Sequence, residues 1–259
     1  MIVLLPPSEG KTAPAVGAPL ELSDLANECL TPAREQLLDA LIRMCTRTPT
    51  KARTVLGLSP NQRDEVSANA GLATANTAPA WQVYTGVLFG ALDFGSLSAA
   101  ARKRAANRLL ITSSLFGIVR PDDPIVAYRL SGDVTLPKVG KVDRFWRHHL
   151  GLALSDSIGD GLVIDMRSGT YVKFWPIPPH LASQALTVKI WQLGPNGSRT
   201  AVSHHNKAAK GDLARLLATT TSAPRTRSAI VDLLRDHNWD AQLSVDPKIG
   251  HDRLDVTIE

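Results

Sequence analysis

The sequence is poor in cysteine, and this excludes several classes of site. Only two cysteines, Cys29 and Cys45, occur in 259 residues. Two thiols cannot build a disulfide framework, and no CxxC pair or Cys/His cluster has the spacing of a zinc site. We therefore expect no metal site and no cofactor, and we expect both thiols to be buried or chemically idle.

The chain also lacks the long apolar segments that membranes and secretion require. No hydrophobic run approaches the roughly 20 residues of a membrane-spanning helix. The apolar run at residues 2–5 is too short for the core of a signal peptide, and no basic segment precedes it. The expectation is a cytoplasmic protein that makes no contact with membranes.

What is present is the composition of an ordinary globular protein with a mild basic excess. Hydrophobic residues make up 44% of the chain and charged residues 20%, and no repeat, low-complexity tract or linker divides it. A single compact domain over residues 1–259 is therefore expected, long enough to bury a real core. The net charge of +5 permits a polyanionic partner if the charge is clustered.

The apolar patterns predict a mixture of helices and short buried strands. Thr31-Pro32 has the form of a helix start, with proline at the first helical position. Further helices are predicted over 50–56, 61–69, 143–154, 207–218 and 226–238, and strands over 1–5, 108–112, 162–165, 187–191, 199–203 and 254–258. This order predicts a mixed α/β or α+β fold with a central sheet, without the regular alternation of a doubly wound fold.

Polar and basic side chains follow four of these predicted strands. If the strands share one sheet and one direction, the loops after them converge, and free backbone N–H groups there favour anions. The loops supply Ser8 and Lys11 after the first strand, Arg120 and Asp122 in the segment after the second, Ser168, Tyr171 and Lys173 after the third, and Lys207 and Lys210 after the fourth, with Tyr128 and Arg129 further along the second segment.

Each loop taken alone has a plainer interpretation. SEGK lacks the GxxxxGK[ST] spacing of a phosphate-binding loop, so Ser8 and Lys11 could simply form a turn. Arg120 could pair with a neighbouring aspartate, and Tyr128-Arg129 could be strand packing. His204 and its neighbour are adjacent, so on a strand they point to opposite faces and do not share a metal ion. No GxSxG, HExxH, GxGxxG or paired-carboxylate pattern identifies a catalytic centre.

A second basic cluster lies at 43–63, within a helical region over about 31–70. Lys51 and Arg53 precede Leu56-Gly57-Leu58, an apolar-Gly-apolar turn between two short predicted helices. A helix-hairpin-helix element offers backbone N–H groups to a nucleic-acid phosphate at such a turn. A plain helical turn with a solvated basic face fits the same residues.

Several segments, in order along nearly the whole chain, resemble the YaaA family of peroxide stress proteins. The resemblance is carried by LLPPSEGK at the start, VYTGVLFGALD at 83–93, SSLFGIVRPDDPIVAYRLS at 113–131, DRFW at 143–146, VIDMRSGTYVK at 163–173 and KAAKG at 207–211. The chain departs from the family in its first loop, PPSEGK in place of an SPAK-like one, and in Lys210, where an arginine is common. Lysine keeps the charge but loses the bidentate fork.

The resemblance implies a protein that protects against hydrogen peroxide and lowers free iron. It also implies DNA binding, an unusual α/β fold, a positively charged cleft and a helix-hairpin-helix element. The residues themselves agree on two of these points, the anion-favouring loops and the hairpin at 50–63.

Three functional hypotheses follow. The first is binding of double-stranded or distorted DNA, with cleft charge from Lys11, Arg120, Arg129, Lys207 and Lys210 and phosphate contacts from Lys51 and Arg53 beside Gly57. The second is an enzyme acting on a nucleotide, nucleobase or similar anionic small molecule, with Ser8, Asp122, Tyr128, Ser168 and Tyr171 as candidate catalytic residues. The third, direct binding of iron, is disfavoured because no ligand cluster is present.

Overall fold

The fold is built around a mixed β-sheet, as the sequence predicts. A computed structural model describes residues 1–194, 198–200, 205–245 and 252–258 of the chain. The central sheet has the strand order β11-β12-β9-β8-β1-β3-β4, with β10 paired to β9. Its strands are β1 (Ile2–Leu5), β3 (Leu109–Ser113), β4 (Gly117–Val119), β8 (Val163–Asp165), β9 (Ala185–Leu193), β10 (Arg199–Thr200), β11 (Asp240–Val245) and β12 (Asp252–Ile258).

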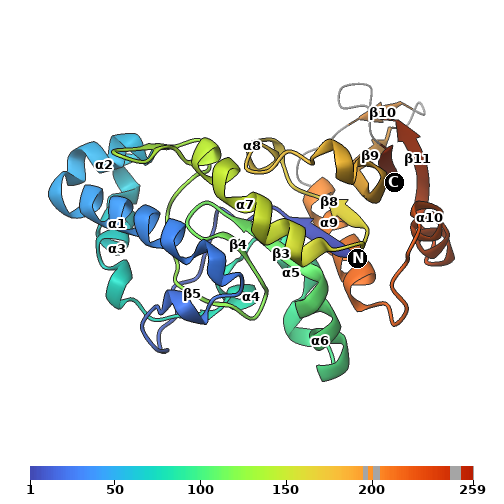
Figure 1. Ribbon diagram of the computed structural model, residues 1–259, viewed down its shortest axis with the longest axis horizontal. Coiled ribbons are helices and arrows are strands. Elements are labelled where there is room, and N and C mark those ends of the chain that lie inside the picture. Colours follow the sequence, from blue (N-terminus) through green and yellow to red (C-terminus); the bar gives the residue numbers. More distant parts are fainter. Residues whose placement is uncertain (195–197, 201–204, 246–251, 259) are drawn as a thin grey trace.

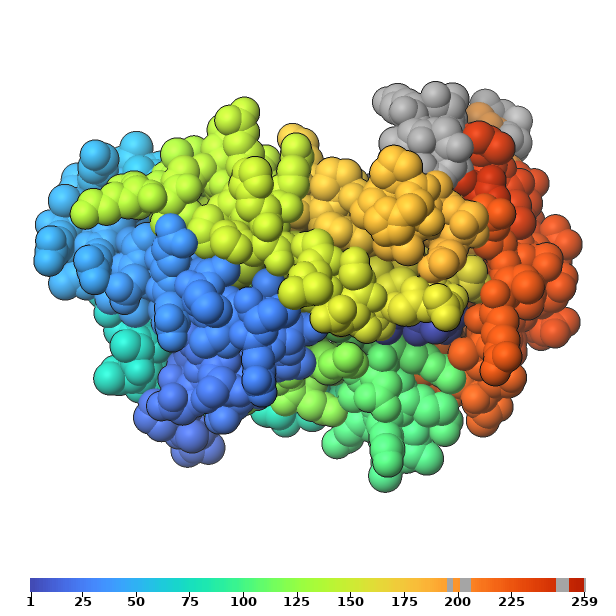
Figure 2. Space-filling model, viewed as in Figure 1, coloured from blue at the N-terminus to red at the C-terminus, as the bar shows by residue number. Residues whose placement is uncertain are grey.

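Short strand pairs and helices complete the architecture. The pairs join β2 (Ala78–Pro79) to β5 (Pro124–Ile125) and β6 (Thr135–Leu136) to β7 (Gly140–Lys141). The helices are α1 (Thr31–Arg47), α2 (Pro49–Val55), α3 (Asp64–Ala70), α4 (Ala80–Val83), α5 (Val87–Leu92), α6 (Ala99–Arg108), α7 (Val142–Ile158), α8 (Gly169–Val172), α9 (His205–Thr219) and α10 (Arg227–Asp236). Figure 1 shows α1 to α3 gathered at one end of the molecule and α10 with β11 at the other, and Figure 2 shows the same two segments at opposite ends of this face.

Strand direction decides which loops meet. Strands β3, β1, β8, β9 and β12 are mutually parallel along the sheet order. The loops after β1, β3 and β8 therefore leave the same edge of the sheet. Strand β10 runs antiparallel to β9, so the shared direction assumed for the 199–203 strand is wrong for residues 199–200, and its remaining residues lie outside the described part of the chain.

Strand β1 lies at the centre of the sheet and is buried along its whole length. Ile2, Val3, Leu4 and Leu5 are each at most 5% exposed. A parallel strand covered on both faces has a continuous apolar run rather than an alternating one. Strand β1 is therefore a fixed base for the PPSEGK loop that follows it.

The SSLFGIV segment is a buried hairpin between β3 and β4. Gly117 has a φ of +77°, and a Cβ there would come within 2.7 Å of the Trp146 ring on α7. The Trp146 indole N–H donates to the carbonyl oxygen of Ser114 at 2.8 Å. The Arg34 guanidinium of α1 donates to the carbonyl oxygens of Phe116 and Ile118. The hairpin thus joins the sheet to α7 and α1.

The helical region at 31–70 contains the helices predicted for it, α1, α2 and α3. Helices α2 and α3 are separated by a turn in which Gly57 has a φ of +66°. The N–H of Leu58 donates to the carbonyl oxygen of Arg53, which is the six-residue bond of a Schellman motif. This geometry explains the glycine at position 57, because a left-handed residue ends the helix there. Binding of nucleic acid at the turn stays a prediction.

Candidate functional site

A cavity of about 700 Å³ opens beyond the carboxyl edge of the sheet. It is lined by the loop after β1, the α4–α5 connection with the start of α5, the segment around residue 130, the loop after β8, residues 188–190 of β9 and the start of α9. Its size is that of a small-molecule site. The polar lining side chains are Ser8, Glu9, Lys11, Thr85, Arg129, Ser131, Ser168, Tyr171, Lys189, Asn206, Lys207 and Lys210.

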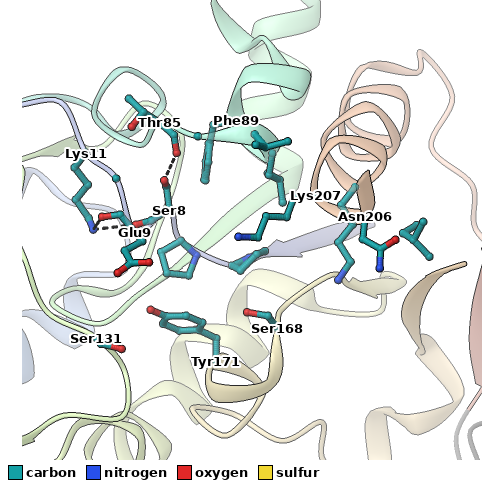
Figure 3. Close-up of a pocket in the computed structure, with 18 of the residues that line it drawn as sticks. Ser8, Glu9, Lys11, Thr85, Phe89, Ser131, Ser168, Tyr171, Asn206 and Lys207 are labelled. Carbon is teal, nitrogen blue, oxygen red and sulfur yellow. Dashed lines mark hydrogen bonds between the residues drawn. The ribbon is translucent and has the colours of Figure 1, made fainter. Parts of the chain in front are cut away.

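The loop after β1 and the α4–α5 connection form one wall of the cavity. The Ser8 hydroxyl donates to the backbone carbonyl oxygen of Thr85, as Figure 3 shows. Gly86 has a φ of +101°, and a Cβ there would stand 3.2 Å from Ser8 Oγ. A Cβ on Gly10 would stand 3.1 Å from Thr85 Oγ1. Ser8 is therefore a structural link between two loops as well as a lining residue.

Lys11 is held inside this wall. Its backbone forms a β-bridge with Tyr84, and its Nζ donates to the carbonyl oxygens of Ser8 at 2.9 Å and Glu9 at 3.4 Å. The amine lies 4.2 Å from the centre of the Tyr128 ring. Burial, with a smaller contribution from the charge of Arg129, lowers the pKa of the amine to about 7. Lys11 therefore changes its charge near neutral pH, unlike an ordinary lysine.

A chain of buried hydroxyls lies beneath Lys11. The Tyr128 hydroxyl is 3.0 Å from that of Tyr84 and 2.8 Å from that of Ser113. Both tyrosines are almost fully buried. Burial raises the pKa of each phenol above its usual range. These hydroxyls stay protonated at neutral pH and link the wall of the cavity to strand β3.

The acidic side chain in the cavity lining is already paired. Glu9 forms an ion pair with the Arg129 guanidinium. The backbone of Arg129 is fixed by Asn69, whose Oδ1 accepts from the Arg129 N–H at 2.9 Å and whose Nδ2 donates to the Arg129 carbonyl oxygen at 2.7 Å. Arg129, predicted as a site residue, therefore lines the cavity. Glu9 holds its side chain and Asn69 holds its backbone.

The loop after β8 brings Ser168 and Tyr171 to the opposite wall. Asp165, at the end of β8, forms a fully buried ion pair with Arg167 at 2.8 Å. Arg167 also donates to the carbonyl oxygens of Tyr171 and Trp175, so this pair fixes the loop. Burial raises the pKa of Tyr171 to about 12. Ser168 is exposed at the mouth of the cavity.

Helix α9 contributes the basic wall. Lys207 is exposed to the cavity, whereas Lys210 is partly buried and its Nζ donates to the carbonyl oxygen of Met166 at 2.9 Å. Burial lowers the pKa of Lys210, and the charge of Asp165 acts in the opposite direction. In Figure 3, Lys11 and Lys207 lie on opposite sides of Ser8, and the Lys11 amine is turned toward the backbone of its own loop. A Cβ on Gly211 would stand 2.3 Å from the Leu88 carbonyl oxygen. Because glycine has no Cβ, α9 can approach α5 this closely.

The structure brings together seven of the predicted site residues in the lining of this cavity. They are Ser8, Lys11, Arg129, Ser168, Tyr171, Lys207 and Lys210. Tyr128 lies directly behind the lining, under Lys11. The convergence expected from the strand ends is therefore present for the loops after β1 and β8.

Other predicted residues lie elsewhere. Arg120 follows β4, which runs antiparallel to β3, so its side chain lies at the far edge of the sheet and donates to the carbonyl oxygens of Ala106 and Asn107. Asp122 is exposed beside it, and Lys173 is exposed after α8. None of these three residues lines the cavity.

Lys51, Arg53 and Gly57 also lie outside the cavity, in the region of α2. Lys51 lines a separate groove of about 520 Å³ between α1, α2 and residues 137–139. Figure 1 shows the segment before α7 reaching across to α2. The cations of this groove are Arg43, Arg47, Lys51 and Lys138.

Several lining residues carry little signal in the sequence and were not predicted. Phe89 and Thr85 belong to the VYTGVLFGALD segment, where Gly86 before an apolar helix was an available signal. Lys189 lies on β9 with its amine 3.8 Å from the Trp191 ring centre. Asn206 has a buried Oδ1 without a hydrogen-bond partner in the described part of the chain. His204 lies outside the described residues.

Membrane spans and metal clusters are both absent from the described residues. Within them, no helix is both long and apolar enough to span a membrane. Among the same residues, no three His, Cys, Asp or Glu side chains come together as a metal site would require.

Comparison with known proteins gives the family. A UPF0246 protein of Streptomyces coelicolor is 43% identical over 259 residues, covering 100% of this chain and 98% of the relative. A UPF0246 protein of Corynebacterium efficiens is 40% identical over 237 residues, 91% of this chain and 92% of the relative. One from Corynebacterium glutamicum strain R is 38% identical over 236 residues, 90% and 91% of the two chains. The family model described as peroxide stress protein YaaA matches residues 1–236, and the chain belongs to this family.

Proposed function

We propose that this chain is a peroxide-stress protein that binds double-stranded or distorted DNA and limits iron-dependent oxidative damage to it. The observation that carries the proposal is the charge of the cavity. Five lysine and arginine side chains line it, four of them besides Lys11, against the single acid Glu9, which is already paired with Arg129. Such an excess of positive charge attracts phosphate groups, and contacts of this kind give a protein affinity for DNA that does not depend on the base sequence.

The dimensions of the cavity favour distorted DNA over a regular duplex. A space of about 700 Å³ suits one nucleotide and is far too small for a duplex. Proteins that receive a single nucleotide extrude it from the stack, which costs least where pairing is already lost. Phe89 and Tyr171 belong to the lining and supply aromatic rings on which a nucleotide base can stack. The cavity would then take one unpaired nucleotide while cations at its rim hold neighbouring phosphates.

The groove beside α2 supports the same proposal. Its four cations lie around an apolar floor that includes Met44 and Val139. Asp39 is its acidic member and forms an ion pair with Arg43 at 2.9 Å. A second basic surface extends the length of DNA backbone that one molecule can contact.

The test is fluorescence anisotropy with two labelled oligonucleotides, a perfect duplex and the same duplex with one unpaired nucleotide. The proposal expects affinity that falls steeply with salt for both and tighter binding of the unpaired site. In the same assay series, DNA pre-incubated with the protein should show fewer strand breaks after exposure to ferrous iron and peroxide than DNA with albumin. Binding that ignores salt, or the absence of binding at low salt, would refute it.

The second candidate is an enzyme acting on a nucleotide, nucleobase or similar anionic small molecule. The specific observation that favours it is the chain of hydroxyls from Ser113 through Tyr128 to Tyr84 under Lys11, because a surface that only holds phosphates does not need it. A panel of nucleotides screened by thermal unfolding tests this candidate. A saturable rise in Tm is expected from a ligand of the cavity.

A further inference from the structure

Lys11 is placed differently from the other cations of the cavity. No carboxylate in the described part of the chain lies within ion-pair distance of its amine, because Glu9, whose backbone it contacts, is engaged by Arg129. The amine lies over the Tyr128 ring at 4.2 Å and 5.5 Å from the Tyr84 ring centre. Its backbone is fixed by the bridge to Tyr84. Lys11 is therefore fixed at its backbone, and its amine has no ion-pair partner in the described part of the chain.

The hydrogen bonds of Lys11 fit a neutral amine as well as an ammonium. A neutral amine has two N–H donors and one lone pair, whereas the ammonium has three donors. Two carbonyl oxygens, those of Ser8 and Glu9, accept from Nζ. With both N–H groups used in this way, the lone pair stays available to a molecule in the cavity.

Burial favours the neutral form of the Lys11 amine. Burial lowers the pKa of the amine to about 7 with help from the charge of Arg129, while Glu65 on α3 and Glu9 oppose the shift. The phenols of Tyr84 and Tyr128 have raised pKa values and carry no charge at neutral pH. Unprotonated Lys11 amines are thus present near neutral pH, and only this form is nucleophilic.

The rest of the cavity suits a ligand with a phosphate and hydroxyl groups. Lys207 lies on the opposite side of Ser8 from Lys11 (Figure 3), and Lys189 and Lys210 lie in the same lining. The hydroxyls of Ser168 and Tyr171 line the wall between these positions. A ligand whose phosphate lies near Lys207 can therefore extend its other end toward Lys11.

We propose that Lys11 is the reactive residue of this cavity and forms a Schiff base with the aldehyde of a phosphorylated sugar. The Nζ lone pair attacks the aldehyde carbon and forms a C–N bond. The two amine protons and the carbonyl oxygen then leave as one water molecule, which gives the imine without any oxidant or reductant. Schiff-base formation is an established use of desolvated lysines.

Two sources supply such an aldehyde. One is the open-chain deoxyribose that remains in DNA when a base is lost, and this version rests on the proposed function of DNA binding. The other is a free sugar phosphate, which needs no DNA. Both present the same chemistry to Lys11, an aldehyde a few bonds from a phosphate.

The test is reductive trapping with cyanoborohydride, which converts the imine to a stable secondary amine. Wild-type protein is incubated with a duplex containing one abasic site or with free 2-deoxyribose 5-phosphate, and adducts are located by mass spectrometry of peptides. The variants are Lys11→Arg, which keeps a cation but removes the nucleophile, and Lys103→Arg, a matched change at an exposed position of α6. Circular dichroism establishes that both variants are folded.

The proposal expects an adduct at Lys11 with at least one of the two substrates, and a total yield of protein adduct that falls at least tenfold in Lys11→Arg and is unchanged in Lys103→Arg. Its rate should rise about tenfold from roughly pH 6 to pH 8, as the neutral fraction of an amine with this pKa does. Trapping of the sugar phosphate by a protein that does not bind DNA would support Lys11 and refute the DNA proposal. DNA binding without any adduct at Lys11 would overturn this inference alone.

Discussion

The guanidinium groups of Arg34 and Arg167 are buried, and they donate hydrogen bonds to oxygen atoms of the protein itself. Arg34 donates to three backbone carbonyl oxygens, and Arg167 is paired with Asp165 at 2.8 Å. Lys11, by contrast, has only two carbonyl partners and lines a cavity. At the scale of the residue, the buried basic side chains therefore divide into those that hold the fold and those that line the cavity.

Asp165→Asn should strongly destabilise the protein. The substitution leaves the Arg167 guanidinium buried with a neutral partner, and breaking a buried pair from one side costs about 3–5 kcal/mol. Urea denaturation measures the change in the free energy of unfolding. The matched control is Asp39→Asn, which breaks an exposed pair with Arg43 and should cost less than about 1 kcal/mol. Equal losses in the two variants would contradict this assignment.

Lys11→Met should flatten the pH dependence of stability. The pKa of Lys11 is lowered to about 7 in the folded protein from 10.5, so the unfolded chain binds more protons between these values. Wild-type stability therefore rises with pH across this window, and the variant lacks that rise. Urea denaturation at several pH values measures the free energy of unfolding of both proteins. The loss of wild-type stability relative to its value at high pH should be largest below pH 7. Parallel curves for wild type and Lys11→Met would contradict the shift, and Lys103→Met serves as the control.

At the scale of the element, apolar patterns predicted most helices and buried strands. The run at residues 2–5 became β1, and Thr31-Pro32 begins α1. Strands β4 and β11 were missed for different reasons. Strand β4 has three residues after a tight turn at Gly117, too few for a pattern, and β11 is mostly exposed at the sheet edge. Short or solvated strands lack the burial signal that identifies the others.

Gly117→Ala should cost more than Gly57→Ala, although both glycines have positive φ. A left-handed conformation costs an alanine roughly 1–2 kcal/mol at either position. At Gly117 the new Cβ would also meet Trp146 at 2.7 Å, whereas nothing lies within 4 Å at Gly57. Overpacking adds about 1–3 kcal/mol. Thermal and urea unfolding of the two variants measure the difference, and equal costs would show that the hairpin yields around Trp146.

The candidate site was predictable in part, because parallel strands bring their following loops to one edge. Lys11 and Ser168 were identified in this way. Lys207 also lines the cavity, but the strand assumed before it runs antiparallel to β9, so strand direction does not explain its position. Arg120 was not placed correctly by that reasoning, since β4 reverses direction and carries it to the far edge. Phe89 and Lys189 were missed because their positions depend on how α5 and β9 pack, which local sequence does not encode.

On the scale of the whole molecule, basic side chains line both the cavity and the groove beside α2. The groove gives a prediction of its own. Lys51→Ala/Arg53→Ala should weaken DNA binding about equally for all sequences and reduce the slope of log affinity against log salt by about 1 for each phosphate group that is no longer neutralised. The anisotropy salt series measures both quantities. A variant that matches wild type at every salt concentration would remove the α2 region from the DNA surface.

The most direct test of the central claim is the affinity of Lys207→Ala for a duplex with one unpaired nucleotide. Lys207 is exposed in the cavity lining, and the control Lys103→Ala removes an exposed lysine of α6 that lies outside that lining. Anisotropy at fixed low salt should show a loss of about tenfold for Lys207→Ala, a smaller loss on the perfect duplex, and wild-type affinity for Lys103→Ala. Equal affinities for all three proteins would contradict the claim that the cavity binds DNA.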